Sequence, residues 1–310
     1  MKIYILDAFH EAGVALARAH AEVVCWPDLA TKNWPEEADG VMVRMTPITA
    51  AQLARARHVK VICKQGVGVD TIDLSAAQQR GIPVLRTPGI NAEAVAEMAF
   101  ALALAVTRRV ARFDRMLRAG EPVVRPQHLG LAMQGKTVGI VGMGEIAQRV
   151  ARKWRGAFDA QLLVYSPRTP AERWSDIPHT RVNSLHALLP QVDLLSLHLP
   201  LTAESRHLIG RAELALMKPD AVLVNTSRGG IIDEHALYEA LQRGHLFGAG
   251  LDVFDVEPPP ADHPLLSLPN VVASPHAGGG TVETQIRSSL QVAQQVLDVL
   301  AGHAPENQVV

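Results

Sequence analysis

The sequence contains few aromatic residues and almost no cysteine. Phe, Trp and Tyr make up 4% of its 310 residues, and its two cysteines are Cys25 and Cys63. Neither cysteine has a second Cys or a His nearby at metal-ligand spacing, so the sequence predicts no metal site. Each cysteine lies in an apolar, strand-like run, and we expect both to be buried core thiols.

The chain also lacks an excess of charge and a long apolar run. Its 30 basic and 31 acidic side chains give a formal net charge of −1, which argues against nucleic acid as a partner. The longest apolar stretch, residues 94–106, contains Glu97 and is shorter than the ~20 residues of a membrane helix. No N-terminal segment has the features of a secretory signal. We therefore expect a cytoplasmic protein without a membrane partner.

What is present is a regular alternation of short β-branched runs with helical patterns. A chain of this length exceeds the usual size of one hydrophobic core, so two domains are expected. In the first third, strands are predicted at Ile3–Leu6, Val41–Val43, Val59–Ile62 and Pro83–Leu85. Strands separated by helical patterns are typical of a parallel sheet flanked by helices. A long helical segment, residues 91–119, is predicted to carry the chain into a second domain.

From Lys136 the alternation resumes and suits a doubly wound sheet. Six strands are predicted, at Thr137–Val141, Gln161–Tyr165, Asp193–Leu197, Ala221–Asn225, Gly248–Val253 and Val271–Ala273. An amphipathic helix over residues 281–300 is expected to return to the first domain. The predicted domains are therefore residues 1–99 with 283–310, which is discontinuous, and residues 100–282.

A glycine-rich turn joins the first strand of the second domain to its helix. Gly142 allows the chain to turn tightly, Gly144 allows the backbone to approach a pyrophosphate, and Ala147 is the third small residue. The helix that starts at Glu145 and Ile146 offers free N–H groups and a positive dipole end to an anion. A tight turn without a ligand is the alternative, but the strand before and the helix after favour nucleotide binding.

The next strand ends without the acid that usually holds the ribose hydroxyls of NAD. Ser166, Arg168 and Thr169 follow it instead, and Arg168 would supply a fixed charge to a 2′-phosphate. An exposed loop with an incidental arginine is the alternative. The sequence predicts a preference for NADP over NAD.

Three later segments carry reactive side chains close to strand ends, which meet at the ligand crevice of a doubly wound sheet. Reduction of a keto acid needs a cation for the carboxylate and a proton donor for the carbonyl oxygen. Arg228 suits the first role and His276 the second, while Glu257 would favour the imidazolium of His276. Taken singly, each residue also fits a structural role in a salt bridge, a proline turn or a loop.

Together with the glycine turn, these segments resemble the D-isomer-specific 2-hydroxyacid dehydrogenase family. The resemblance extends to residues 66–70, 87–97 and 198–202, and so covers nearly the whole chain. It implies a Rossmann-type doubly wound domain, residues 100–282, and a smaller flavodoxin-like α/β substrate-binding domain. The implied activity is hydride transfer between a nicotinamide coenzyme and a small D-2-hydroxy acid or 2-keto acid.

The resemblance also implies roles for individual residues. Arg228 is the substrate-binding arginine, His276 the acid/base that also contacts the substrate, and Glu257 its partner, while Asp252 holds the nicotinamide carboxamide. The backbone amides of Val67 and Gly68 bind the substrate carboxylate. The remaining coenzyme contacts are Leu199, Pro200, Thr202, Thr226, Ser227 and Gly279. Ala147 in place of a third glycine and Ser166 in place of the usual acid depart from the family pattern.

Several alternatives remain at this stage. Residues 67–70 and 87–89 are particularly similar to 3-phosphoglycerate dehydrogenases, in which case Arg44 or Lys64 would hold the phosphate. Glyoxylate, hydroxypyruvate and bulkier keto acids are equally open as substrates. The same fold serves NAD(H)-binding corepressors, so a binding protein is the alternative outside the enzymes. The apolar helix over residues 98–106 and the family resemblance predict a homodimer.

Overall fold

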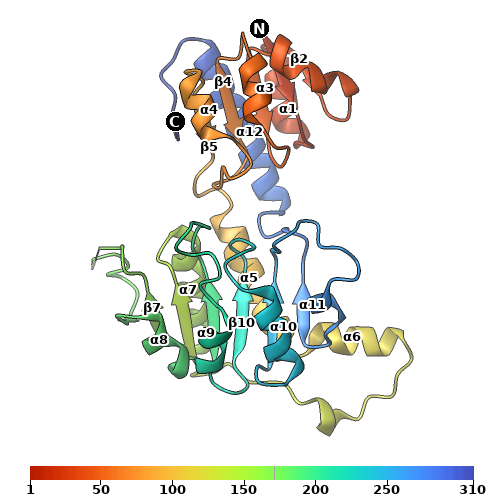
Figure 1. Ribbon diagram of the computed structural model, residues 1–310, viewed down its shortest axis with the longest axis vertical. Coiled ribbons are helices and arrows are strands. Elements are labelled where there is room, and N and C mark those ends of the chain that lie inside the picture. Colours follow the sequence, from red (N-terminus) through yellow and green to blue (C-terminus); the bar gives the residue numbers. More distant parts are fainter. Residues whose placement is uncertain (171) are drawn as a thin grey trace. The chain divides into compact units, whose positions relative to one another are not determined.

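The computed structural model describes residues 1–170 and 172–310. Its internal contacts divide the chain into two compact units, unit 1 (Met1–Asn91 with Gly280–Val310) and unit 2 (Ala92–Gly279). Each unit is built around its own parallel sheet (Figure 1). The predicted α/β class is confirmed, whereas the predicted domain boundaries and the substrate-binding role of the first domain remain predictions.

Unit 1 contains a five-stranded parallel sheet in the order β2-β1-β3-β4-β5, which is the flavodoxin-like order. Its strands are β1 (Lys2–Ile5), β2 (Glu22–Cys25), β3 (Gly40–Val43), β4 (Val61–Lys64) and β5 (Val84–Arg86). Its helices are α1 (Glu11–Arg18), the 3₁₀ helix η1 (Leu29–Asn33), α2 (Trp34–Glu37), α3 (Ala50–Arg55), α4 (Leu74–Gln79) and α12 (Val282–Leu300).

The two ends of the chain meet in the core of unit 1. Helix α12 begins where the Thr281 hydroxyl accepts the Thr284 N–H, and it packs against α1, β3 and β4. Val292 and Val296 of this helix are buried together with Ile3 of β1. Figure 1 shows the two helices side by side, α1 in red and α12 in blue. The apolar face of this last helix therefore packs against the first strands of the chain.

Strand β2 lies at the edge of the sheet and was not among the predicted strands, although Cys25 was placed in a strand-like run. Among the described residues it pairs with β1 alone, and its side chains are exposed or partly exposed, unlike those of a central strand. The prediction for Cys25 was therefore wrong, because this last residue of β2 is only partly buried. Cys63 lies in the central strand β4 and is buried, as expected.

Unit 2 contains a seven-stranded parallel sheet in the order β12-β11-β10-β9-β6-β7-β8. This is a Rossmann arrangement, in which the order of the strands changes direction between β6 and β9 while the strands themselves stay parallel. Its strands are β6 (Thr137–Val141), β7 (Gln161–Tyr165), β8 (Thr180–Arg181), β9 (Leu194–Leu197), β10 (Val222–Asn225), β11 (Gly248–Leu251) and β12 (Val271–Ala273). The six predicted strands are present, and the two-residue β8 is a seventh that was too short and polar to detect.

Helices cover both faces of this sheet and enclose two apolar cores. One face carries α5 (Ala92–Thr107) and α7 (Glu145–Phe158). The other face carries α8 (Leu185–Leu188), η3 (Leu189–Gln191), α9 (Arg211–Leu216), α10 (Glu234–Gln242) and α11 (Pro264–Ser267). Among the described residues, no helix is long and apolar enough to cross a membrane.

The long helix predicted over residues 91–119 is broken, so that prediction was wrong. Helix α5 ends at Thr107, Arg109 adopts a left-handed conformation with φ of 55°, and α6 (Val110–Arg118) starts in a new direction. The returning chain stabilises the break, because the Leu131 N–H bonds to the Thr107 carbonyl. The 3₁₀ helix η2 (Arg125–His128) lies between the end of α6 and Leu131. Figure 1 shows α6 and the segment after it running along the outside of unit 2.

Candidate active site

The candidate residues of unit 2 lie in the turns that follow β6, β7, β9, β10, β11 and β12. Because all strands of the sheet are parallel, these turns share one edge of the sheet. The residues concerned are Gly142, Gly144, Glu145, Ile146, Ser166, Arg168, Thr169, Leu199, Pro200, Thr202, Thr226, Ser227, Arg228, Asp252, Glu257, His276 and Gly279.

The turn between β6 and α7 requires glycine at its first position. Gly142 has φ of 100°, and a Cβ atom there would lie 2.2 Å from the His198 carbonyl oxygen. At Gly144 an added Cβ would meet no described atom within 4 Å, so space remains above the backbone. No side chain in the described part of the chain caps the N-terminus of α7, whose first N–H groups therefore remain available.

These features fit a dinucleotide coenzyme. Free N–H groups at a helix N-terminus and open space beside a glycine suit a pyrophosphate. Across the sheet edge, Thr226 Oγ1 is buried without a hydrogen-bond partner among the described residues, so it can bind a polar group of a ligand. The side chain of Glu145 is held in ion pairs with Arg149 and Arg173, which leaves only the backbone of this residue for an anion.

The loop after β7 is held in shape by an arginine that lies outside the predicted set. Arg181 donates to the carbonyl oxygens of Ser166 and Thr169, each at 2.8 Å. Within the loop the two hydroxyl oxygens of Ser166 and Thr169 are 2.7 Å apart. Arg168 is exposed, and its charge contributes to lowering the pKa of Glu204, after the larger effect of the Thr202 hydroxyl on that carboxylate.

The turn after β9 contains a histidine that stays neutral. Burial lowers the pKa of His198 to about 3, and its Nε2 lies 2.8 Å from Ser196 Oγ. Leu199 and Pro200 follow, and the Thr202 N–H donates to Ser205 Oγ at 2.7 Å. The predicted coenzyme residues of this turn thus lie beside the Gly142 turn, because Gly142 packs against the His198 carbonyl.

The segment after β10 is organised by Asn225. Its Nδ2 donates to the Arg228 carbonyl oxygen at 2.8 Å, and its Oδ1 accepts from both the N–H and the hydroxyl of Ser227. The guanidinium of Arg228 donates to the Ser227 carbonyl oxygen at 2.6 Å. Asn225 is 2% exposed, so this part of the sheet edge is rigidly positioned.

Asp252, at the end of β11, holds the loop that follows β12. Its carboxylate accepts the hydroxyl of Ser274 at 2.6 Å and the N–H groups of Ala277 and Gly278 at 2.8 Å each. Asp252 is 1% exposed, so these donors compensate for the burial of the carboxylate. Its proposed contact with the nicotinamide carboxamide remains a prediction, and its evident structural task is to anchor the His276 loop.

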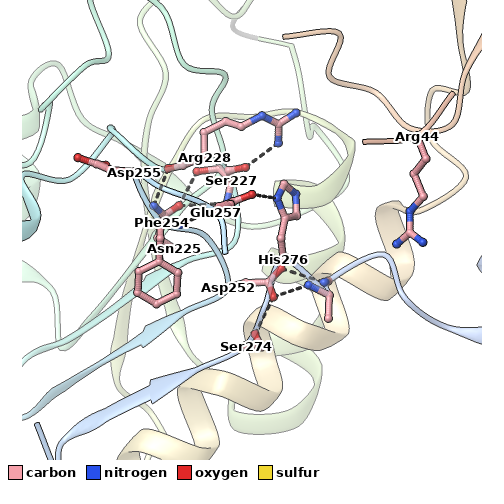
Figure 2. Close-up of polar contacts among 12 residues, drawn as sticks. Arg44, Asn225, Ser227, Arg228, Asp252, Phe254, Asp255, Glu257, Ser274 and His276 are labelled. Atoms are coloured by element: carbon pink, nitrogen blue, oxygen red, sulfur yellow. Dashed lines mark hydrogen bonds and ion pairs between the residues drawn. The ribbon is translucent and has the colours of Figure 1, made fainter. Parts of the chain in front are cut away.

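His276 and Glu257 form a hydrogen-bonded pair, with 2.7 Å between Nδ1 and Oε2 (Figure 2). Burial tends to raise the pKa of Glu257, but the hydrogen bond and charge of His276, together with the charge of Arg228, outweigh burial and lower it. His276 has φ of 53°, and its N–H donates to the Asp252 carbonyl oxygen at 2.7 Å. The imidazole is therefore held in an uncommon backbone conformation.

The remaining candidates belong to unit 1 and are described within it. Val67 and Gly68 follow β4, where the Gly66 N–H donates to Thr87 Oγ1 at 2.8 Å. Arg44 follows β3, and its N–H donates to the Asp7 carboxylate at 2.6 Å. Lys64 is 6% exposed and donates to the Arg44 carbonyl oxygen.

Comparisons with known proteins are consistent across the chain. Residues 100–278, more than half of the chain, match the model of the D-isomer specific 2-hydroxyacid dehydrogenase, NAD binding domain. The chain belongs to this dehydrogenase family. It is 38% identical to a glyoxylate reductase of Korarchaeum cryptofilum over 99% of this chain and 95% of that protein. The crystal structure of the TT0316 protein from Thermus thermophilus has a TM-score of 0.91 and 41% identity, with full coverage of both chains.

A further relative is longer than this chain. The chain is 39% identical to a D-3-phosphoglycerate dehydrogenase of Methanocaldococcus jannaschii, matching 100% of this chain but only 59% of that protein. As a member of the dehydrogenase family, the chain is an oxidoreductase that transfers hydride between a nicotinamide coenzyme and a hydroxy acid or keto acid. The relatives named here are a reductase and a dehydrogenase, which favours an enzyme over a corepressor without enzymatic activity.

Sequence reasoning missed the residues whose hydrogen bonds hold the loops of this dehydrogenase site in place. Asn225 and Ser274 were given no role of their own, and Arg181 was not considered. Each is a polar residue inside or next to a short strand, and such a position is the one available signal. A hydrogen bond to a residue far along the chain cannot be read from local spacing.

Proposed function

We propose that this dehydrogenase reduces a small 2-keto acid to the D-2-hydroxy acid, with Arg228, Glu257 and His276 as its catalytic set. The observation that carries the assignment is the His276–Glu257 pair, whose carboxylate also lies within the electrostatic influence of Arg228. Cation, acid and anion come from three strand ends of one unit. A structural salt bridge would not need all three at one sheet edge.

The residues divide the chemistry as follows. When bound, the nicotinamide coenzyme supplies the hydride. Arg228 holds the substrate carboxylate and polarises the carbonyl. Glu257 accepts the hydrogen bond at Nδ1 of His276, which leaves Nε2 to give its proton to the carbonyl oxygen. The amides of Val67 and Gly68 in unit 1 are proposed as a second site for the carboxylate.

We infer glyoxylate or hydroxypyruvate as the first substrates to test, because the chain matches a glyoxylate reductase over nearly its full length. 3-Phosphohydroxypyruvate is the second candidate, favoured by the phosphoglycerate dehydrogenase relative and by Arg44. Lys64 is a weaker candidate for the phosphate, since it is buried and donates to the Arg44 carbonyl oxygen. A spectrophotometric screen of these keto acids decides between them. An Arg44→Ala variant should lose activity selectively with the phosphorylated substrate.

NADPH is proposed as the preferred coenzyme. Ser166 stands where an acid would repel a 2′-phosphate, and the exposed Arg168 would contribute a hydrogen bond between charged groups. Such a bond is worth about 1.5–3 kcal/mol, or roughly ten- to a hundredfold in affinity. Arg168→Ala should therefore raise KM for NADPH and leave KM for NADH unchanged. The surface variant Arg243→Ala should change neither KM. A parent enzyme with higher kcat/KM for NADH would contradict the proposal.

A homodimer is proposed on the basis of exposed apolar side chains outside α5. The helix that motivated this prediction is largely used within unit 2, because Leu102 and Val106 are buried against its own sheet. Leu117 of α6 and Leu129 in the following segment are 70% and 69% exposed. Burial against a second copy would remove this apolar surface from water. Light scattering should give a dimeric mass, and Leu117→Asp with Leu129→Asp should lower it. The cytoplasmic location remains a prediction.

A further inference from the structure

Two loops that carry proposed catalytic residues touch through their backbones. The loop after β10 carries Arg228 and continues into Gly229, while the loop after β11 contains Phe254 and leads to Glu257. A Cβ atom at Gly229 would lie 1.9 Å from the Phe254 carbonyl oxygen, so only glycine permits this approach. The positions of the two loops are consequently coupled at this point.

An aspartate side chain joins the same two loops. Asp255 Oδ1 accepts the N–H of Gly230 at 2.5 Å, immediately beyond the close contact at Gly229. Asp255 is itself held from the other side, because its N–H donates to Glu234 Oε1 at 2.8 Å. Glu234 Oε2 in turn lies 3.0 Å from His263 Nε2, and the side chains of this pair are 19% and 14% exposed. Asp255 therefore connects Gly230 to a series of polar contacts that runs through Glu234 of α10 to His263.

The anchor at Gly230 complements the anchor at the other end of the Arg228 segment. Asn225 binds the Arg228 carbonyl oxygen on one side, and Asp255 binds the Gly230 N–H on the other. Between them lies Gly229, and Gly230 has φ of 75°. Figure 2 shows Asp255 and Phe254 beside the Asn225–Arg228 segment. The Gly230 carbonyl oxygen also accepts the His207 N–H at 2.7 Å, so loss of the Asp255 anchor would free the N–H side of Gly230, the side that faces the Arg228 segment.

We propose that Asp255 is a positioning residue that sets the place of the Arg228 guanidinium relative to Glu257 and His276. The inference rests on the proposed function, in which Arg228 holds the substrate carboxylate. In this role Asp255 acts through the backbone N–H of Gly230. Asp255 is an exposed residue. Its side chain positions the Arg228 loop through one hydrogen bond, which it accepts from the Gly230 N–H.

Asp255→Ala should raise KM for the keto acid about tenfold, because a hydrogen bond to a charged acceptor is lost and Arg228 is misplaced. The dissociation constant of NADPH should not change, since the coenzyme turn after β6 is untouched. Asp255→Asn keeps an oxygen acceptor, so its KM should stay close to that of the parent. Asp255→Glu moves the carboxylate by one methylene and should resemble Asp255→Ala. The exposed Asp262→Ala is the matched control and should behave like the parent.

A double-variant cycle separates positioning from a general loss of structure. If Asp255 acts through Arg228, then Asp255→Ala should add less than twofold to the effect of Arg228→Ala on kcat/KM. Independent, multiplicative effects would overturn the inference. So would a parental KM in Asp255→Ala when Arg228→Ala raises it. If Arg228→Ala itself leaves KM unchanged, the proposed role of Arg228 fails first and the inference fails with it. Should Asp255→Ala not fold, the same comparison of KM between Asp255→Asn and Asp255→Glu decides the matter.

Discussion

His276 Nδ1 lies 2.7 Å from Glu257 Oε2, although the two residues are 19 positions apart and follow different strands. Each partner is held by a further hydrogen bond to the segment after β11. Glu257 Oε1 accepts the Phe254 N–H at 3.1 Å, and the His276 N–H donates to the Asp252 carbonyl oxygen. The pair is therefore preorganised by the backbones of two loops, which is the condition for efficient proton transfer by a histidine.

Replacement of the histidine should separate catalysis from coenzyme binding. We expect His276→Ala to lower kcat for keto-acid reduction by about 10²–10⁴-fold, because the general acid is lost. The affinity for NADPH, measured by fluorescence titration, should stay within twofold of the parent. His235→Ala removes an exposed histidine that is also paired with a glutamate, so it controls for the loss of a surface ion pair. Equal turnover in the two variants would contradict the acid role.

The Glu257→Gln variant should show an altered pH profile. The lowered pKa of Glu257 means that its carboxylate is ionised over the whole working range and stabilises the protonated imidazole of His276. In the variant this anion is absent, so the protonated imidazole loses its ion-pair partner. Reduction of the keto acid, followed as kcat/KM against pH, should therefore fall off at a lower pH than in the parent. Superimposable profiles would exclude the proposed partnership.

His198 should make the folded protein sensitive to mild acid. Its pKa is about 3 in the folded state against about 6.5 in the unfolded chain, so the unfolded state binds the extra proton as the pH falls below 6.5. The stabilisation is present above pH 6.5 and is lost progressively toward pH 3. Between pH 7 and 5 this contribution to the free energy of unfolding should fall by about 2 kcal/mol. His198→Asn should lack that part of the decline in urea titrations, whereas the exposed His235→Asn should retain it.

Asp252 should prove important for stability as well as for activity. In Asp252→Asn, an amide N–H₂ would face the N–H groups and the hydroxyl that now donate to the carboxylate. Leaving a buried donor without an acceptor costs about 1–3 kcal/mol, so we expect the free energy of unfolding to drop by that amount. Activity should fall too, because the His276 loop loses its anchor. Asp262→Asn, at an exposed position, should change the unfolding free energy by less than about 0.5 kcal/mol.

Local patterns in the sequence were sufficient for most of the fold. The central strands were predicted because they are buried on both faces and therefore appear as continuous apolar runs. The two-residue β8 was missed because it has no such run, and the edge strand β2 was not predicted because its apolar run after Glu22 is short. The break between α5 and α6 was missed because it depends on a bond from Leu131 to Thr107, across a loop. A periodic pattern contains no information about such a contact.

The sequence by itself determined the alternation of strands and helices, the glycine turn at Gly142 and the presence of Arg228, Glu257 and His276 near strand ends. Those features depend on residue type and on short spacing along the chain. Only the tertiary structure decided which atoms meet: Asp252 with the His276 loop, Lys64 with the Arg44 carbonyl oxygen, and Asp255 with Gly230. Each of these contacts joins segments that follow different strands, and their distance is set by how neighbouring strands pair in the sheet.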